Sequence, residues 1–136
     1  MTLFNLSKTG LILSILSIIA GAVVRATGSG NGCGSSWPSC NGQLIPSLNS
    51  ASEQIEFSHR SISGLLLIVT LVIFIKSFHP SVPNIQKKVI KYLTFFVLFE
   101  ALIGAVIVLY EWVGMNSSLP RVAAVPLHLV NTFGLL

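Results

Sequence analysis

The sequence predicts an all-α protein, a polytopic transmembrane four-helix bundle, and three observations support this fold class. Of its 136 residues, 52% are hydrophobic and only 9% are charged, whereas soluble domains average about 25% charged residues. The mean hydropathy is +0.82. Four apolar segments run through the chain, and three of them approach the roughly 20 residues that a helix needs to cross a bilayer. We therefore expect lipid to surround the protein.

The apolar segments predict a single transmembrane four-helix domain that covers residues 1–136. The predicted spans lie at about residues 4–25, 60–78, 91–110 and 121–136. A long external loop, residues 26–58, separates the first two spans. The fourth segment is still apolar at Leu136, where the sequence stops. Because a chain terminus inside the bilayer would be unusual, we interpret the fourth span as truncated and the chain as the N-terminal part of a longer protein.

The basic residues are divided between the two sides of the predicted membrane domain. The lysines lie before the first span or between the second and third, at Lys8, Lys76, Lys87, Lys88 and Lys91. The arginines lie on the opposite side, at Arg25, Arg60 and Arg121. Cytoplasmic loops carry an excess of basic residues, so we expect a plasma-membrane protein with its N-terminus and 79–91 loop in the cytoplasm. The net charge of +4 forms no single basic patch, and we expect no nucleic-acid partner.

Small residues and one carboxylate stand out within the spans. Gly10, Ser14, Ser17 and Gly21 share one helical face of the first span, and such a stripe favours close approach of another helix. Glu100 lies in the third span. An intramembrane carboxylate is costly and usually faces a cavity or a partner. Whether Glu100 lines a functional site or only supports packing stays open.

Cys33 and Cys40, the two cysteines of the chain, both lie in the predicted external loop. An oxidising compartment favours a disulfide between them. A structural zinc site needs four ligands, and the sequence lacks the C-x-x-C-H motif of covalent haem attachment. We expect a disulfide and no other metal site. The spacing does not decide between a structural and a redox-active pair, and we favour the structural one.

Two histidines lie near the external ends of separate spans. His59 follows Glu56 by one helical turn on a polar face that leads into the second span, and His128 lies about two turns inside the fourth. Haem iron accepts axial histidines, and Arg25 and Arg60 are candidates to pair with haem propionates. Two interpretations stay open: the histidines ligate a haem together, or they are an interfacial residue and a helix-packing residue.

Three stretches of the chain resemble motifs of the haem A synthase family. The first is the string GAVVRATGSG at residues 21–30, followed by Cys33, Trp37-Pro38, Cys40 and Gly42. The second is EFSHR at residues 56–60, which resembles the family's E-x-x-H-R element. The third is HLVN at residues 128–131, which resembles its H-L-x-N element. Together the motifs cover most of the chain in the family's order.

The resemblance implies an eight-helix enzyme built from two similar four-helix halves, of which this chain would be the N-terminal one. The implied reaction oxidises a methyl group of haem O to the formyl group of haem A for terminal oxidase assembly. His59 and His128 would ligate the substrate haem, and Glu56 would be the carboxylate beside it. Cys33 and Cys40 would form the external disulfide.

The resemblance also implies a set of cofactors and partners. A haem b cofactor would occupy the other half of the protein. The partners would be membrane lipid, the haem O substrate, the enzyme that produces haem O, and an electron donor that the sequence does not identify.

The chain departs from the family in two places. Gly34, Ser35 and Ser36 stand where a Pro-Asp pair is expected, and Glu100 stands where an amide or an apolar residue is more usual. Two other functions stay open. A non-catalytic b-type haem protein would need the two histidines but not Glu56 or the cysteines. A transporter half would use Glu100 and the histidines as a proton or ion path and would bind no haem.

Overall fold

The structure, a computed structural model, describes all residues except 1, 48, 114–117 and 136. Within the described residues it contains four α-helices and one short 3₁₀ turn, η1, so the predicted all-α fold class is confirmed. The helices are α1 (Leu3–Thr27), α2 (Ala51–Ser77), α3 (Asn84–Leu109) and α4 (Leu119–Phe133), and η1 covers Ser29–Asn31. Helices α1, α2 and α3 are long and apolar enough to cross a membrane, and the chain is a multi-pass membrane protein.

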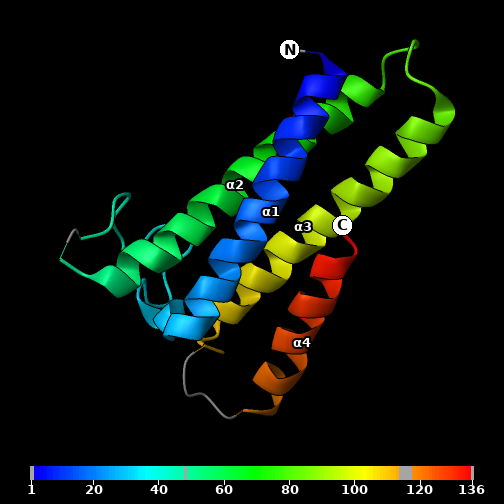
Figure 1. Cartoon of the computed structure of the whole chain (residues 1–136). Helices are drawn as coiled ribbons and strands as arrows, with labels where there is room; N and C mark the ends of the chain where they lie inside the picture. Colours follow the sequence, from blue (N-terminus) through cyan, green and yellow to red (C-terminus); the bar gives the residue numbers. More distant parts are fainter. Residues whose placement is uncertain (1, 48, 114–117, 136) are drawn as a thin grey trace.

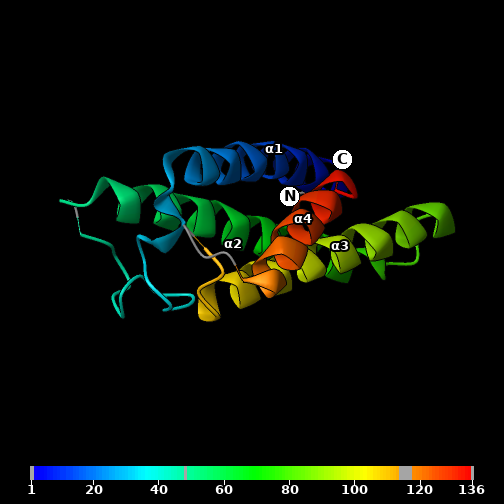
Figure 2. The ribbon, with the colours of Figure 1, turned by 90° about the horizontal axis from the view of Figure 1, so that it is seen from below.

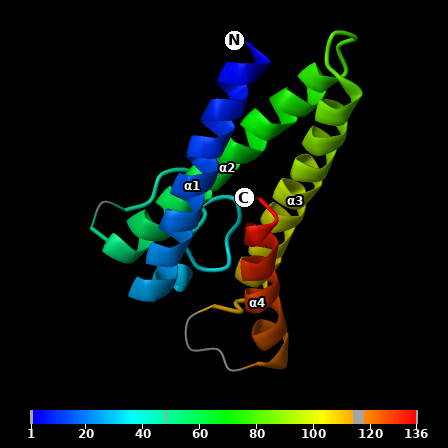
Figure 3. The same cartoon turned by 45° about the vertical axis from the view of Figure 1, so that its right-hand side comes forward.

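Neighbouring helices in the sequence are also neighbours in space (Figure 1). Helix α1 packs along α2, α2 packs along α3, and α4 packs along α3. Helix α2 therefore contacts both α1 and α3, and it crosses α3 in the view of Figure 2. The N-terminus and the α2–α3 turn lie at one end of the molecule, and the segment between α1 and α2 lies at the other (Figure 3).

Side-chain caps and a glycine define the ends of the first two helices. The Thr2 and Ser50 side chains accept hydrogen bonds from backbone N–H groups in the first turns of α1 and α2, which satisfies donors that a helix start leaves unpaired. Gly28 ends α1 in the left-handed conformation, with a φ of 67°. Helix α2 begins at Ala51, so Glu56 and His59 lie on a helix, as expected for the polar face that leads into the second span. The first turns of α2 therefore belong to the segment predicted as the external loop.

The predicted stripe of small residues on α1 lies against α2. Gly10 and Ser14 are buried. The Ser17 hydroxyl oxygen lies 2.8 Å from that of Ser63 on α2. Small side chains let the two backbones approach, and the hydroxyl pair satisfies two polar groups that lipid could not. The stripe therefore makes the α1–α2 interface close and partly polar.

The segment between α1 and α2 folds back onto the start of α2. Cys33 and Cys40 form a disulfide, and both side chains are fully buried. Gly32 lies so close to α2 that a Cβ atom there would be 2.5 Å from the backbone carbonyl carbon of Ser52. The disulfide loop, residues 33–40, is therefore packed on α2 and does not project freely from the helices.

We predict that Gly32→Ala lowers the free energy of unfolding by about 1–3 kcal/mol, the usual cost of overpacking. The added Cβ would meet backbone atoms of Ser52 and Glu53, which cannot move without distorting α2. Gly64→Ala is the matched control because nothing lies within 4 Å of its Cβ position and alanine suits a helix interior. Thermal unfolding in detergent measures both. A melting temperature of Gly32→Ala equal to that of the parent would contradict the close approach.

Candidate functional site

Glu56 and Arg60 form a buried ion pair at the start of α2. They are one turn apart, and their side chains are 4% and 9% exposed. Arg60 donates from Nη2 to Glu56 Oε1 and from Nη1 to the backbone carbonyls of Ser36 and Ser39. Glu56 Oε2 accepts a hydrogen bond of 2.9 Å from the backbone N–H of Cys33. The pair therefore ties the disulfide loop to α2.

This ion pair engages two residues for which the sequence predicted a role at the haem, Glu56 and Arg60. A buried charge is tolerated only when it is paired and hydrogen-bonded, and the loop backbone completes that pairing here. Glu56, the predicted catalytic carboxylate, has both oxygens engaged. Arg60 has both terminal nitrogens engaged, and only its buried Nε lacks a hydrogen-bond partner. Arg25, the other predicted propionate ligand, is exposed in the last turn of α1.

His59 lies one turn beyond Glu56 and faces α1. A Cβ atom at Gly21, the last member of the small-residue stripe, would lie 3.0 Å from Cε1 of the imidazole, so the glycine makes room for the ring. The Nδ1 atom of His59 is buried and has no hydrogen-bond partner. The ring is close enough to His128 and Glu100 to interact electrostatically with both side chains.

Glu100 of α3 is held by the polar face of α4. Its Oε1 accepts a hydrogen bond of 2.6 Å from the Thr132 hydroxyl, and its Oε2 accepts one of 2.6 Å from Asn131 Nδ2. Asn131 Nδ2 also donates to the Phe96 carbonyl of α3. The Nδ1 atom of His128 lies 3.3 Å from Glu100 Oε1. The polar side chains of α4 thus converge on one carboxylate.

The sequence singled out Glu100 of the third span and His128 of the fourth but did not connect them. A signal was present, because an intramembrane carboxylate requires polar partners and α4 carries three polar side chains on one face. The sequence did not show that α4 packs against α3 at the height of Glu100.

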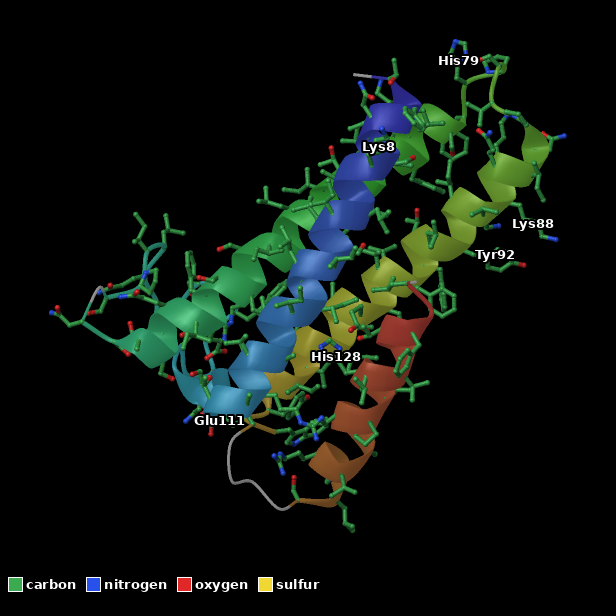
Figure 4. The ribbon with its side chains drawn as sticks, viewed as in Figure 1. Lys8, His79, Lys88, Tyr92, Glu111 and His128 are labelled. Carbon is green, nitrogen blue, oxygen red and sulfur yellow. A yellow bond between two sulfur atoms is a disulfide. The ribbon has the colours of Figure 1, made fainter. Side chains whose placement is uncertain are left out.

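His128 lies against α3 as His59 lies against α1. A Cβ atom at Gly104 would be 3.5 Å from Cε1 of the His128 ring. In Figure 4 the ring projects from α4 toward the other helices. Its Nδ1 is buried and makes no hydrogen bond of good geometry, although the Glu100 carboxylate is within ion-pair distance. The two predicted histidines therefore share one feature, a glycine of a neighbouring helix beside the ring, and differ in that His128 also has a carboxylate close to its Nδ1.

This pair of imidazoles fits the donor set of a haem. Buried polar atoms without a partner are rare in proteins and call for an explanation such as a ligand; His59 Nδ1 is such an atom, whereas Glu100 lies 3.3 Å from His128 Nδ1. Among the described residues, no group of three or more His, Cys, Asp or Glu side chains is arranged to hold a bare metal ion. Two histidines suit an iron whose other ligands come from a porphyrin. His79, the third histidine, is exposed in the α2–α3 turn and contacts Ser81.

Comparison with known proteins identifies the relatives of the chain. Residues 5–56 match the model of a family described as cytochrome oxidase assembly protein. The chain is also 40% identical over 100 residues to a heme A synthase of an Exiguobacterium species, covering 71% of this chain and 33% of that protein. The chain belongs to the haem A synthase family. The residues matched by the family model include α1, the disulfide loop and Glu56, and both site histidines lie beyond them.

Two further relatives extend the similarity along the chain. A heme A synthase of Macrococcus caseolyticus is 36% identical over 119 residues, which cover 85% of this chain and 40% of that protein. A protein of Thermus thermophilus named protoheme IX farnesyltransferase is 39% identical over 132 residues, which cover 93% of this chain and 21% of that protein. The chain thus spans between a fifth and two fifths of the length of these relatives. No solved structure matches it.

We predict that Arg60→Ala lowers the free energy of unfolding of the haem-free protein by about 3–5 kcal/mol, the usual cost of leaving a buried charge unpaired. The substitution leaves the buried Glu56 carboxylate without its charge partner and the Ser36 and Ser39 carbonyls without their hydrogen-bond donor. Arg25→Ala is the control, because an exposed arginine should contribute within about 0.5 kcal/mol. Denaturant unfolding in mixed micelles measures the free energy of unfolding of both variants. An equal loss of stability in Arg60→Ala and Arg25→Ala would show that the ion pair does not hold the loop.

Proposed function

We propose that this chain is the substrate-haem half of a haem A synthase, an oxidoreductase that converts a methyl group of haem O to the formyl group of haem A for terminal oxidase assembly. The observation that carries the proposal is the placement of His59 of α2 and His128 of α4, each with its ring against a glycine of a neighbouring helix and near enough to the other to interact electrostatically. The relatives named heme A synthase support the class of reaction.

His59 and His128 would hold the haem by its iron. They lie on different helices, and a site between helices is where bundles bind porphyrins. When bound, the haem supplies the methyl group to be oxidised and an iron that accepts two imidazoles. Gly21 and Gly104 set the position of the two rings because a larger residue at either place would press on an imidazole.

Glu56 would act on the substrate through its charge. It lies one turn from His59, and its two oxygens are fixed by Arg60 and by the backbone N–H of Cys33. A negative charge held in place stabilises positive charge that develops nearby and costs no reorganisation during the reaction. The disulfide between Cys33 and Cys40 would serve this role structurally, because it shapes the loop that fixes Glu56.

The arginines would differ in their contribution to propionate binding. Arg25 is exposed at the end of α1 and is free to approach a carboxylate. Arg60 already uses its two terminal nitrogens for Glu56 and the loop, so only Nε would remain for a propionate.

We propose a plasma-membrane location with this site in the external half of the bilayer. Lys8 and Lys88 lie at the same end of the molecule as His79 (Figure 4), and such clustering of lysines favours a cytoplasmic position. A haem b cofactor would belong to a second, similar half. The similarity to part of a protoheme IX farnesyltransferase supports an enzyme that produces haem O as a partner, besides an electron donor.

We predict that His59→Ala and His128→Ala each weaken the reduced-minus-oxidised haem spectrum of the intact protein purified with haem supplied. Each variant removes one imidazole from the iron. His79→Ala is the control, because this histidine is exposed in the α2–α3 turn. A folded parent protein without a haem spectrum would exclude the ligand assignment and favour a transporter. A haem spectrum without haem A formation would favour a simple b-type haem protein.

We predict that Glu56→Gln lowers haem A formation by about 10²-fold, the scale of losing one preorganised electrostatic contact, while haem remains bound. Glu53→Gln is the matched control, because Glu53 also binds the external segment, through Ser47 N–H and Asn41 Nδ2, but lies farther from His59. Chromatography of extracted haems measures the product. Equal loss in both variants would indicate that only the anchoring of the external segment matters.

A further inference from the structure

Glu100 is an acidic side chain that the proposed reaction does not use. It lies in α3, which is long and apolar enough to cross a membrane. A carboxylate at such a position is costly unless it is paired. The contacts of Glu100 therefore bear on both how its charge is stabilised and what the side chain does.

Two residues of α4 fix the Glu100 carboxylate from both sides. The Thr132 hydroxyl donates to Oε1 and Asn131 Nδ2 donates to Oε2, each at 2.6 Å. Asn131 is only 5% exposed, and its second hydrogen bond, to the Phe96 carbonyl, attaches it to α3 as well. The carboxylate therefore has a defined position on the α3–α4 interface.

The Glu100 carboxylate can accept a further hydrogen bond, and His128 lies on the side where it would do so. The Nδ1 atom lies 3.3 Å from Glu100 Oε1 and has no hydrogen-bond partner of good geometry. Charge-assisted hydrogen bonds measure about 2.7–2.9 Å, so a small rotation of the ring would complete one. The His59 ring has no carboxylate partner of this kind: its Nδ1 makes no hydrogen bond of good geometry, the backbone of Ser17 is the hydrogen-bonding group beside it, and the Glu56 oxygens are engaged by Arg60 and Cys33.

A histidine that ligates a metal usually donates its other ring N–H to a carboxylate or a carbonyl. Such a hydrogen bond places the proton on one nitrogen, leaves the other bare for the metal, and makes the imidazole a stronger electron donor. Glu100 and His128 have the residue types and the separation for this relationship.

We propose that Glu100 is a positioning residue for His128: it accepts the Nδ1–H and holds the ring with Nε2 available to haem iron. The inference rests on the proposed ligation by His128. The two proposed haem ligands would then be unequal, since the imidazole of His128 has a carboxylate beside its Nδ1 and that of His59 does not.

The first test is the tautomer of His128 in the intact, haem-free protein, measured by nitrogen-15 NMR of histidine-labelled protein in lipid nanodiscs at a pH where the ring is neutral. Loss of one signal in His128→Ala assigns the resonance. We expect the proton of His128 on Nδ1, and we expect the Nε2–H form to increase in Glu100→Gln. A parent protein with the proton mainly on Nε2 would overturn the proposal, and this measurement requires no variant of Glu100 to fold.

The second test is the reduction potential of the haem in the loaded protein. Glu100→Gln should shift the midpoint potential to more positive values, because a weaker acceptor lowers electron donation from His128 and so stabilises ferric iron less. Glu100→Asp should restore part of the shift. Thr94→Val is the control, because Thr94 is a buried polar residue of α3 that bonds to the Ile90 carbonyl of its own helix.

The two proposals fail in different ways. If His128→Ala leaves the haem spectrum unchanged, the ligation is wrong and the role of Glu100 is wrong with it. If His128→Ala removes the spectrum while Glu100→Gln changes neither the tautomer nor the potential relative to Thr94→Val, only the positioning role is overturned.

Discussion

Hydrocarbon offers no hydrogen-bond partner, so each polar side chain within the helices of this protein depends on a partner in the protein itself. The chain meets this constraint at two main points. Glu56 and Arg60 bind the disulfide loop to the start of α2. Glu100 joins α3 to the polar face of α4. Because the first point lies beside His59 and the second beside His128, the position of both histidines depends on these contacts.

Helix packing and the candidate site use the same small residues. Gly21 belongs to the stripe that lets α1 approach α2, and its missing side chain is also the space beside the His59 ring. Gly104 has the same relation to His128. A substitution that filled either space would disturb the interface and the imidazole together. The site is therefore a consequence of how closely these helices pack, and not an addition to a bundle that would form without it.

The sequence predicted features that lie within one segment, such as a helix or a packing face. It did not predict contacts between two segments. Apolar runs predicted the helices, and the spacing of Ser14 and Ser17 predicted a packing face, because both signals repeat along one helix. The partners of Glu100 could not be predicted, since helical periodicity identifies the polar face of α4 but not the helix that it contacts. Glu56 was expected to be a carboxylate available for chemistry, and only the folded loop shows that Arg60 and Cys33 engage it.

A cryo-EM structure of the intact protein with bound haem, at a resolution that defines imidazole rings, tests the central claim most directly. The claim is that two sets of paired polar groups bring His59 and His128 to one haem. The predicted result is iron between the two rings, with the Glu100 carboxylate against Nδ1 of His128 and the Glu56–Arg60 pair intact beneath the loop. Iron bound by other residues, or a Glu100 side chain turned away from α4 toward lipid, would contradict it.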